Sequence, residues 1–483
     1  MLTKTDYKNY LECPMWLWLA KHRPELLPEI TADLQRRFDT GNEVDALAKK
    51  LFPGGIEIEG YNKEGWVNTQ KAIKGGAKIL FQPTVIAGEL SCRADILTKN
   101  EDDSWDINEV KMAASAKSEY VYDVGFQKIC FERAGIKIRK TNIIHIDNTY
   151  VRHGEIEPEK LFALEDITSE MDKYLTETEE GIKEALKVVK IKDEPSLELI
   201  NGCNNPKSCE YLECYCNGIK GVQDVVKDIQ PKHLLALINR EILNLKNVDQ
   251  GVLDAAGYVS PEKFTKIDAV AIKKEFEKLI YPLHFFDYET YGSAIPPFDG
   301  TRPYQQVPFQ YSLIVKDSPD SSARHFEFLA RKFKDPVPEL LSQLKREIGP
   351  KGSVIVWYAP FESGRNKEMS EMEPDFADFL GDVTNRIFDL LLIFKHKNQM
   401  YIKSEFNKLA SLKIVLPVMC PELSYGNLAI QGGGDASSSW PVLTDEKTST
   451  KEKEQLEKNM LAYCKRDTEA MVGILDKVLE DIK

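Results

Sequence analysis

The chain has 483 residues and a formal net charge of −13, because 77 Asp and Glu outnumber 64 Lys and Arg. At roughly 150 residues per domain this length suggests about three units, and 42% hydrophobic residues exclude a disordered, collagen-like or small disulfide-stabilised protein. The acidic balance argues against a wholly basic nucleic-acid coat, but not against a nuclease whose carboxylates are neutralised by metal. No apolar run approaches the roughly 18 residues of a membrane span, and no secretory signal is visible, so we expect a cytoplasmic protein without membrane contact.

The first part of the chain, residues 1–218, has the mixed pattern of an α/β domain. Apolar residues at helical spacing alternate with short runs typical of strands, and Gly135 marks a helix end. The expected elements are helices within 2–26 and over 30–51, 117–134 and 168–188, and strands within 78–98, 105–113 and 141–147.

The remaining patterns predict a helical connector over 219–280 and a second α/β domain over 281–483. The Gly/Ser-rich segment 431–440 is expected to be a mobile loop. The expected elements of the second domain are strands over 281–291, 309–315, 325–330 and 353–359, and helices over 336–348 and 452–482. The predicted fold class is therefore α/β, with two domains joined by helices.

A first group of candidate catalytic residues is Asp95, Glu109 and Lys111. Glu109 and Lys111 are two residues apart in a predicted strand, so they share a face, and the short turn before that strand brings Asp95 beside Glu109. Two adjacent carboxylates can bind a divalent metal that activates water, and a nearby Lys can stabilise the developing charge. An exposed hairpin with alternating charges is the plainer alternative.

In order along the chain, Asp95, Glu109-Val-Lys111 and the helical Gln127 resemble the RecB-like branch of the PD-(D/E)xK nucleases, which includes CRISPR-associated exonucleases. The resemblance implies a restriction-endonuclease-like fold for residues 1–218. It also implies that these four residues are catalytic and that Asp95 and Glu109 hold metal. Two positions differ, because Phe131 stands where the family has a Tyr and Asp45 stands where it has a helical His. A degenerate fold that only holds its substrate is the alternative.

A second group consists of cysteines, four of which fall within fourteen residues. So dense a cluster in an Asn- and Gly-rich segment indicates a soft metal. The gaps of five, four and one residues differ from the paired spacing typical of zinc and are compatible with an iron–sulfur loop. Several RecB-like nucleases hold a 4Fe-4S cluster with one Cys before the nuclease motifs and three after them. This resemblance implies Cys13, Cys203, Cys209 and Cys216 as ligands, with Cys214 spare or replacing one of them; zinc, or no metal, is the alternative.

The third group combines a strand and a distant helix. Asp287 and Glu289 share one face of an apolar strand, and Tyr463 and Asp467 share one face of the C-terminal helix. Carboxylates on an otherwise buried strand are unfavourable unless they hold metal. A two-metal phosphodiesterase needs several such carboxylates and a group that positions the attacking water. An ordinary charged strand and helix is the plainer alternative.

This third group resembles the DnaQ-like 3′→5′ exonucleases of the RNase H fold, in the subclass that carries a Tyr (DEDDy). The resemblance implies that Glu362, which follows Phe361 in the predicted strand SVIVWYAPFESGR, takes the place of the family's middle Asp. Asp389 matches the position where these folds often carry an Asp entering the next helix. Mg²⁺ or Mn²⁺ would then be held by Asp287, Glu289, Glu362 and Asp467, while Tyr463 positions the water.

Three further segments, 2–7, 296–313 and 411–417, resemble a bacterial family catalogued as domain of unknown function 2779. Its members pair a RecB-like half with an exonuclease-like half. We therefore expect a metal-dependent nuclease, a 3′→5′ exonuclease on single-stranded DNA at the C-terminal site, with a second RecB-like site. DNA is favoured over RNA, although no residue pattern distinguishes them. The alternatives are a nucleic-acid-binding adaptor with one or both sites degenerate, and an iron-sensing or redox protein.

Overall fold

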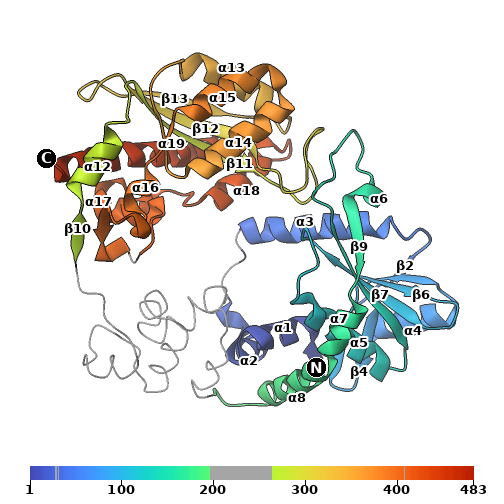
Figure 1. The fold of residues 1–483 in the computed structure, drawn as a ribbon. Helices are drawn as coiled ribbons and strands as arrows, with labels where there is room; N and C mark the ends of the chain where they lie inside the picture. The colour runs from blue at the N-terminus through green and yellow to red at the C-terminus, as the bar shows by residue number, and fades with distance from the viewer. Residues whose placement is uncertain (28–29, 31, 196–263, 407) are drawn as a thin grey trace, which may run out of the picture. The chain divides into compact units, whose positions relative to one another are not determined.

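The computed structural model describes residues 1–27, 30, 32–195, 264–406 and 408–483, which form two compact units (Figure 1). Unit 1 contains most of residues 1–195, and unit 2 contains residues 264–483. Both mix helices with sheets, so the predicted α/β class is confirmed. Most of the predicted connector lies outside the described residues, as do Cys203, Cys209, Cys214 and Cys216.

Unit 1 is built on a six-stranded sheet in the order β2-β3-β6-β7-β8-β9, and a smaller sheet has the order β1-β5-β4. Its strands are β1 (Leu2–Thr3), β2 (Ile56–Glu57), β3 (Ile79–Phe81), β4 (Thr84–Ala87), β5 (Leu90–Arg93), β6 (Ile96–Lys99), β7 (Trp105–Lys111), β8 (Ile138–Ile146) and β9 (Phe162–Asp166). Its helices are α1 (Lys4–Glu12), α2 (Pro14–His22), α3 (Ala32–Lys49), α4 (Asn62–Lys74), α5 (Tyr120–Arg133), α6 (Pro158–Leu161), α7 (Thr168–Lys173) and α8 (Leu175–Val189).

Local backbone geometry divides several elements that the sequence predicts as continuous. The stretch 78–98, predicted as two strands, forms four short ones, and the chain turns at Gln82 and Gly88, both of which have positive φ. The predicted helix over 168–188 is interrupted at Tyr174, which lies between α7 and α8. β6 pairs antiparallel with β7, and this pairing positions the first candidate group.

Unit 2 is built on a five-stranded sheet in the order β13-β12-β11-β14-β15. Its strands are β10 (Thr265–Ile267), β11 (Leu283–Tyr291), β12 (Val307–Lys316), β13 (Arg324–Leu329), β14 (Val354–Val356), β15 (Ile387–Asp389) and β16 (Tyr401–Lys403). Its helices are α12 (Ala269–Phe276), α13 (Val337–Glu347), α14 (Ala359–Met372), α15 (Ala377–Asn385), α16 (Leu391–Phe394), α17 (Leu412–Met419), α18 (Gly433–Thr444) and α19 (Thr450–Asp481). β10 pairs with β16, so the end of the predicted connector is part of unit 2.

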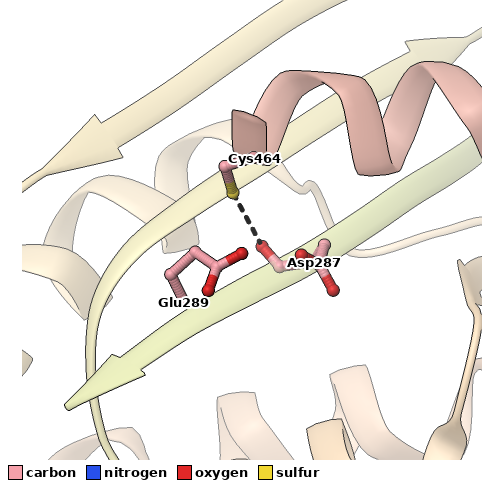
Figure 2. Close-up of side chains that lie close together, drawn as sticks. All are labelled: Asp287, Glu289 and Cys464. Carbon is pink, nitrogen blue, oxygen red and sulfur yellow. Dashed lines mark hydrogen bonds between the residues drawn. The ribbon is translucent and has the colours of Figure 1, made fainter. Parts of the chain in front are cut away.

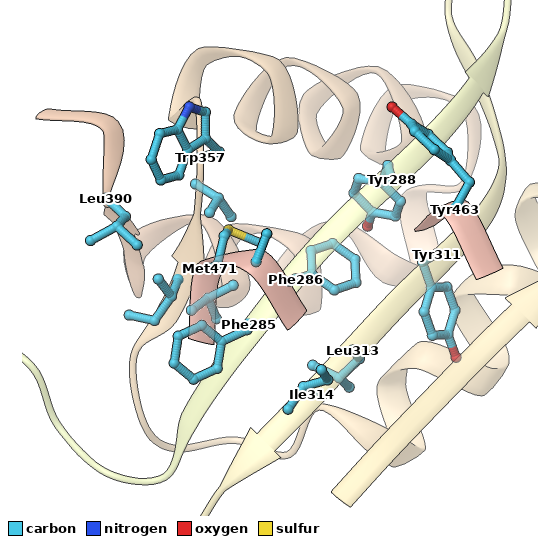
Figure 3. Close-up of a cluster of buried hydrophobic side chains, with 14 of the residues drawn as sticks. Phe285, Phe286, Tyr288, Tyr311, Leu313, Ile314, Trp357, Leu390, Tyr463 and Met471 are labelled. Carbon is cyan, nitrogen blue, oxygen red and sulfur yellow. The ribbon is translucent and has the colours of Figure 1, made fainter. Parts of the chain in front are cut away.

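The core of unit 2 lies between its sheet and the long helix α19, which packs on β11 and β12. Phe285 and Phe286 on β11 are fully buried, and Met471 of α19 belongs to the same cluster (Figure 3). Burying each such side chain stabilises the fold by about 1.5–3 kcal/mol. This packing fixes α19 against the central strand and so fixes the side chains that both elements present to the site.

The segment 431–440 is not the mobile loop that its Gly and Ser residues predict, because most of it belongs to α18. The cause is Trp440, which is fully buried, stacks on Phe309 with ring centroids 4.9 Å apart and donates its indole N–H to the carbonyl oxygen of Ala330 at 2.8 Å. A single large aromatic residue thus anchors a segment of low helix propensity.

None of the helices in the described ranges is both long and apolar enough to cross a membrane.

Candidate functional site

The candidate site in unit 2 is built on β11, the central strand of the sheet. Asp287 and Glu289 are two residues apart on this strand, so their side chains share a face. β11 runs parallel to β14, and β14 runs parallel to β15, so the C-terminal ends of these strands meet at one edge. Open α/β sheets usually bind their ligands at such an edge.

Two further acidic side chains reach this edge after β14 and β15. Glu362 does not lie in the strand but in the first turn of α14, where it is 3% exposed. Asp389 is the last residue of β15, and its carboxylate accepts a hydrogen bond from the backbone N–H of Leu391 at 3.2 Å. The charge of Asp389 acts on Glu362, and that of Glu362 acts on Asp287. Asp389 therefore lies at the margin of the group.

Helix α19 supplies the other half of the site. Tyr463 and Asp467 are one helical turn apart and both are buried, and α19 packs directly on β11. The hydroxyl group of Tyr425 donates a hydrogen bond to the carboxylate of Asp467, and the hydroxyl of Tyr463 also acts on this carboxylate and lowers its pKa. Tyr425 was not predicted, because nothing in its sequence spacing connects the short turn Tyr425–Asn427 to α19.

The four carboxyl groups of Asp287, Glu289, Glu362 and Asp467 all have raised pKa values. Loss of solvent is the largest cause for each, and repulsion between neighbouring carboxylates adds to it for Asp287 and Glu289. Burial raises the pKa of Glu362 to about 8 and that of Asp467 to about 7. Carboxylates gathered in this way are unfavourable unless they are protonated or a cation lies among them.

Lys413 of α17 is a basic neighbour of this group that the sequence analysis did not single out. Its ammonium lowers the pKa of Glu289 and of Asp467, and it lies 6.0 Å from the ring centroid of Tyr463. It is exposed, so solvent screens its charge. Lys413 does belong to the segment 411–417, whose family resemblance was the available signal.

Cys464 also enters the site and was missed, because an isolated Cys carries no pattern in sequence. It is fully buried on α19, and its thiol donates to the backbone oxygen of Asp287 at 4.0 Å (Figure 2). One ligand atom from each of Asp287, Glu289 and Cys464 lies within 4.8 Å of the other two. Burial, and then the nearby carboxylates, raise the pKa of the thiol well above its usual range.

The first candidate group also converges, in unit 1. Asp95 was predicted to lie inside a strand, but it directly precedes β6. Its carboxylate accepts a hydrogen bond from the backbone N–H of Val110 at 2.8 Å. Glu109 lies beside it on β7 and is 2% exposed. Burial, with the repulsion of Glu109 added, raises the pKa of Asp95 to about 7.

Glu109, in contrast, is surrounded by donors from the protein itself. Its Oε1 accepts from Lys4 at 2.6 Å and from Lys111 at 2.9 Å, and its Oε2 accepts from Gln127 at 2.7 Å. Burial alone would raise the pKa of Glu109, but the ammonium groups of Lys111 and Lys4 outweigh it and hold the pKa well below its usual range. Lys4 was not predicted as a site residue, although it lies in the segment 2–7 that carries the family resemblance.

Asp45, predicted to take the position of the His of RecB-like nucleases, also lies in the unit 1 group. The side-chain amide of Gln82 lies 3.3 Å from the Asp45 carboxylate and 3.4 Å from that of Asp95, so it bridges the two. These residues line a cavity of about 440 Å³ together with Lys49 and Arg93. The unit 1 group therefore contains both carboxylates and bases.

Of the four predicted cluster ligands, Cys13 is the one in the described part of the chain. It is buried between α1 and α2 in unit 1. The geometry of the predicted iron–sulfur site therefore remains a prediction.

The raised carboxyl pKa values predict that stability falls as pH rises when no metal is bound. Unfolded carboxyl groups have pKa values near ~4, whereas Asp467 and Glu362 reach about 7 and about 8 when folded. The folded state holds more protons in this interval, so the free energy of unfolding decreases as pH rises from about 4 to 8. In chelator at about pH 8, Asp467→Asn should be more stable than the parent by on the order of 2 kcal/mol, because Asn removes the charge and keeps an oxygen that accepts from Tyr425.

Denaturant unfolding across about pH 5 to 9 measures this effect. The matched control is Asp476→Asn, an exposed position on the same helix, which should leave stability unchanged. If Asp467→Asn is less stable than the parent in chelator at high pH, Asp467 is not an uncompensated buried charge.

Comparison with known proteins relates part of the chain to proteins whose function is not described. Residues 284–411, which carry Asp287, Glu289, Glu362 and Asp389, match the family described as "Domain of unknown function (DUF2779)". The chain is 25% identical over 218 residues to the "Uncharacterized protein MG366 homolog" of Mycoplasma pneumoniae, a match covering 42% of this chain and 33% of that protein. It is 26% identical over 227 residues to "Uncharacterized protein MG366" of Mycoplasma genitalium, covering 44% and 34%. The matches thus span about a third of the length of these relatives, and the resemblance to the DUF2779 family is supported over residues 284–411.

Proposed function

We propose that this protein is a metal-dependent nuclease that hydrolyses phosphodiester bonds and shortens single-stranded DNA from its 3′ end at the site around β11. The proposal depends on one observation, the convergence of four carboxyl groups at one edge of the unit 2 sheet. Three of them are buried and Asp287 is half-buried, and their mutual repulsion is not matched by equally close bases in the described ranges. A structural ion-pair network has no such excess of acid, because each buried charge needs a partner.

The donor set fits Mg²⁺ or Mn²⁺, which prefer carboxylate oxygens. The most specific indication is Glu362, whose Oε2 is buried and has no hydrogen-bond partner among the described residues. An orphaned buried oxygen is unfavourable unless a ligand contacts it. Asp287, Glu289, Glu362 and Asp467 would hold the ions, with Asp389 at the margin.

Bound ions would activate a water molecule and neutralise the charge that develops on the phosphate. The protein's own contribution is to position groups. Burial holds the pKa of Tyr463 well above its usual range, so its hydroxyl keeps its proton and can orient water but cannot act as a base. Tyr425 fixes the orientation of Asp467 through its hydrogen bond. Lys413, exposed beside Glu289, would attract the phosphates of the incoming strand.

For unit 1, a role in holding nucleic acid is favoured over cutting it. The reason is that Lys4, Lys111 and Gln127 already take about three of the roughly four lone-pair positions of the Glu109 carboxylate, whereas a metal ligand needs free lone pairs. This supports the alternative in which one of the two nuclease-like sites has lost its activity. The proposed RecB-like fold would then serve as a platform for the strand that unit 2 degrades.

The 4Fe-4S cluster remains a proposal that rests on the cysteine spacing and on the RecB-like resemblance. Its role would be structural, because joining Cys13 to cysteines near residue 209 closes a long segment of chain and restricts the unfolded state.

With Mg²⁺ or Mn²⁺, the protein should convert a single strand labelled at its 5′ end into a ladder of shorter products. Chelator should stop the reaction, and so should Asp467→Asn, because the ions lose a ligand. Tyr463→Phe should slow cleavage by about 10- to 100-fold and leave metal binding largely intact, since its hydroxyl orients water. Denaturing gel electrophoresis of timed samples measures each effect.

Tyr401→Phe is the matched control, because Tyr401 is a buried tyrosine of unit 2 whose hydroxyl bonds to Asp481, away from the carboxylate group. It should cleave at the parental rate. Cleavage that persists unchanged in both Asp287→Asn and Asp467→Asn would falsify the proposed function of unit 2.

The contribution of unit 1 can be separated by combining variants. We predict that no cleavage survives Asp287→Asn, because Glu109 is neutralised by Lys4 and Lys111. The opposite result, an activity that survives Asp287→Asn and disappears on adding Lys111→Ala, would make unit 1 a second nuclease site. The measurement is the same end-labelled assay, extended to double-stranded substrates.

Protein purified without oxygen should be brown and contain iron and acid-labile sulfide. Cys209→Ala should lose the iron and destabilise the protein, because the cluster would no longer join Cys13 to the cysteines near residue 209. Comparison with Cys214→Ala, which should retain iron, tests the ligand assignment within this group of cysteines. If the purified protein is colourless and contains stoichiometric zinc and no iron, the iron–sulfur assignment is wrong and these cysteines form a zinc site.

A further inference from the structure

Cys464 introduces a soft ligand beside the hard oxygen ligands of the unit 2 site. It directly follows Tyr463 and lies three residues before Asp467 on α19. Because successive helical residues are rotated by about 100°, its side chain points in a different direction from that of Tyr463. Its Sγ approaches β11, where the thiol donates to the backbone oxygen of Asp287 at 4.0 Å (Figure 2).

The spacing of the donor atoms is compatible with one small ion. A carboxylate oxygen from Asp287, one from Glu289 and the Cys464 sulfur all lie within 4.8 Å of one another. In a tetrahedral zinc site, with bonds of about 2.0–2.3 Å, such donors are roughly 3.5 Å apart. Side-chain rotations that close these separations by about 1 Å would therefore complete a three-ligand site.

A further buried carboxylate lies near Asp287, on α14. Glu362 is 3% exposed, and its Oε2 has no hydrogen-bond partner in the described part of the chain. Its charge acts on Asp287, but the group of donor atoms within 4.8 Å of one another does not include it. Two carboxylates alone would not distinguish zinc from magnesium, but a thiolate does, because sulfur is a poor ligand for Mg²⁺ and a strong one for Zn²⁺.

We propose that Asp287, Glu289 and Cys464 form a binding site for thiophilic divalent cations, with zinc as the physiological example, and that zinc bound there blocks the site. A bond forms between the metal and the Cys464 sulfur, and the thiol proton is released to solvent. The ion occupies the carboxylates that magnesium needs and draws them toward the sulfur. The binding itself is independent of the proposed nuclease activity, whereas the inhibition rests on it.

Cobalt(II) is a suitable probe, because it takes the place of zinc and its bond to a thiolate absorbs in the near ultraviolet. Full-length protein titrated with Co²⁺ should develop this band in difference spectra, in which the absorption of the protein before cobalt addition is subtracted. Cys464→Ala and Asp287→Asn should each lose the part of the band that belongs to this site. Cys420→Ala, at another buried Cys of unit 2, should retain it.

Zinc should also inhibit magnesium-supported cleavage by the parent at a concentration at least tenfold lower than in Cys464→Ala, with the rate of each protein compared with its own rate in magnesium alone. If Cys464→Ala fails to fold, Cys464→Ser provides a smaller change at the same position. Identical cobalt spectra and identical zinc sensitivity in the parent and the Cys464 variant would overturn the site. A Cys464-dependent band in a protein without magnesium-supported cleavage would instead uphold the site and refute the proposed nuclease function.

Discussion

The burial of like charges beside β11 is the constraint on which the candidate site of unit 2 depends. Asp287 and Glu289 lie on a central strand whose other side chains are mostly apolar or aromatic, and α19 covers this strand and carries a third carboxylate, Asp467. Such a group destabilises the fold unless protons or cations are bound. The apolar contacts between β11 and α19 supply the stability that makes this concentration of charge tolerable (Figure 3).

The two units differ in how the charge of their buried carboxylates is neutralised. In unit 1, Glu109 is neutralised within the protein by Lys4 and Lys111, and its second oxygen accepts from Gln127. In unit 2, the charge that lowers the pKa of Glu289 is that of the exposed Lys413, which is screened by solvent. A neutralised group suits structure or substrate holding, whereas an uncompensated group suits metal binding, and this difference is the basis for proposing unit 2 as the catalytic one.

The site in unit 2 also contains more than the two-metal chemistry requires. Tyr425 holds Asp467 through a second hydroxyl, and Cys464 presents sulfur to the same carboxylates. The first restricts the geometry of a ligand, and the second changes which cations the ligands prefer. Metal choice at this site would therefore be decided by a residue that takes no part in the proposed hydrolysis.

The sequence by itself determined the α/β class, the strand that carries Asp287 and Glu289, and the helix that carries Tyr463 and Asp467, because each of these depends on a local period of two or 3.6 residues. It could not determine that Tyr425 bonds to Asp467 across 42 residues, or that Lys4 reaches Glu109 across 105. The prediction for 431–440 was also wrong. Gly and Ser predict a loop there, but the contacts of Trp440 with Phe309 and Ala330 stabilise a helix. Those features depend on the packing of segments far apart in the chain, which only the tertiary structure decided, since no local pattern specifies a distant neighbour.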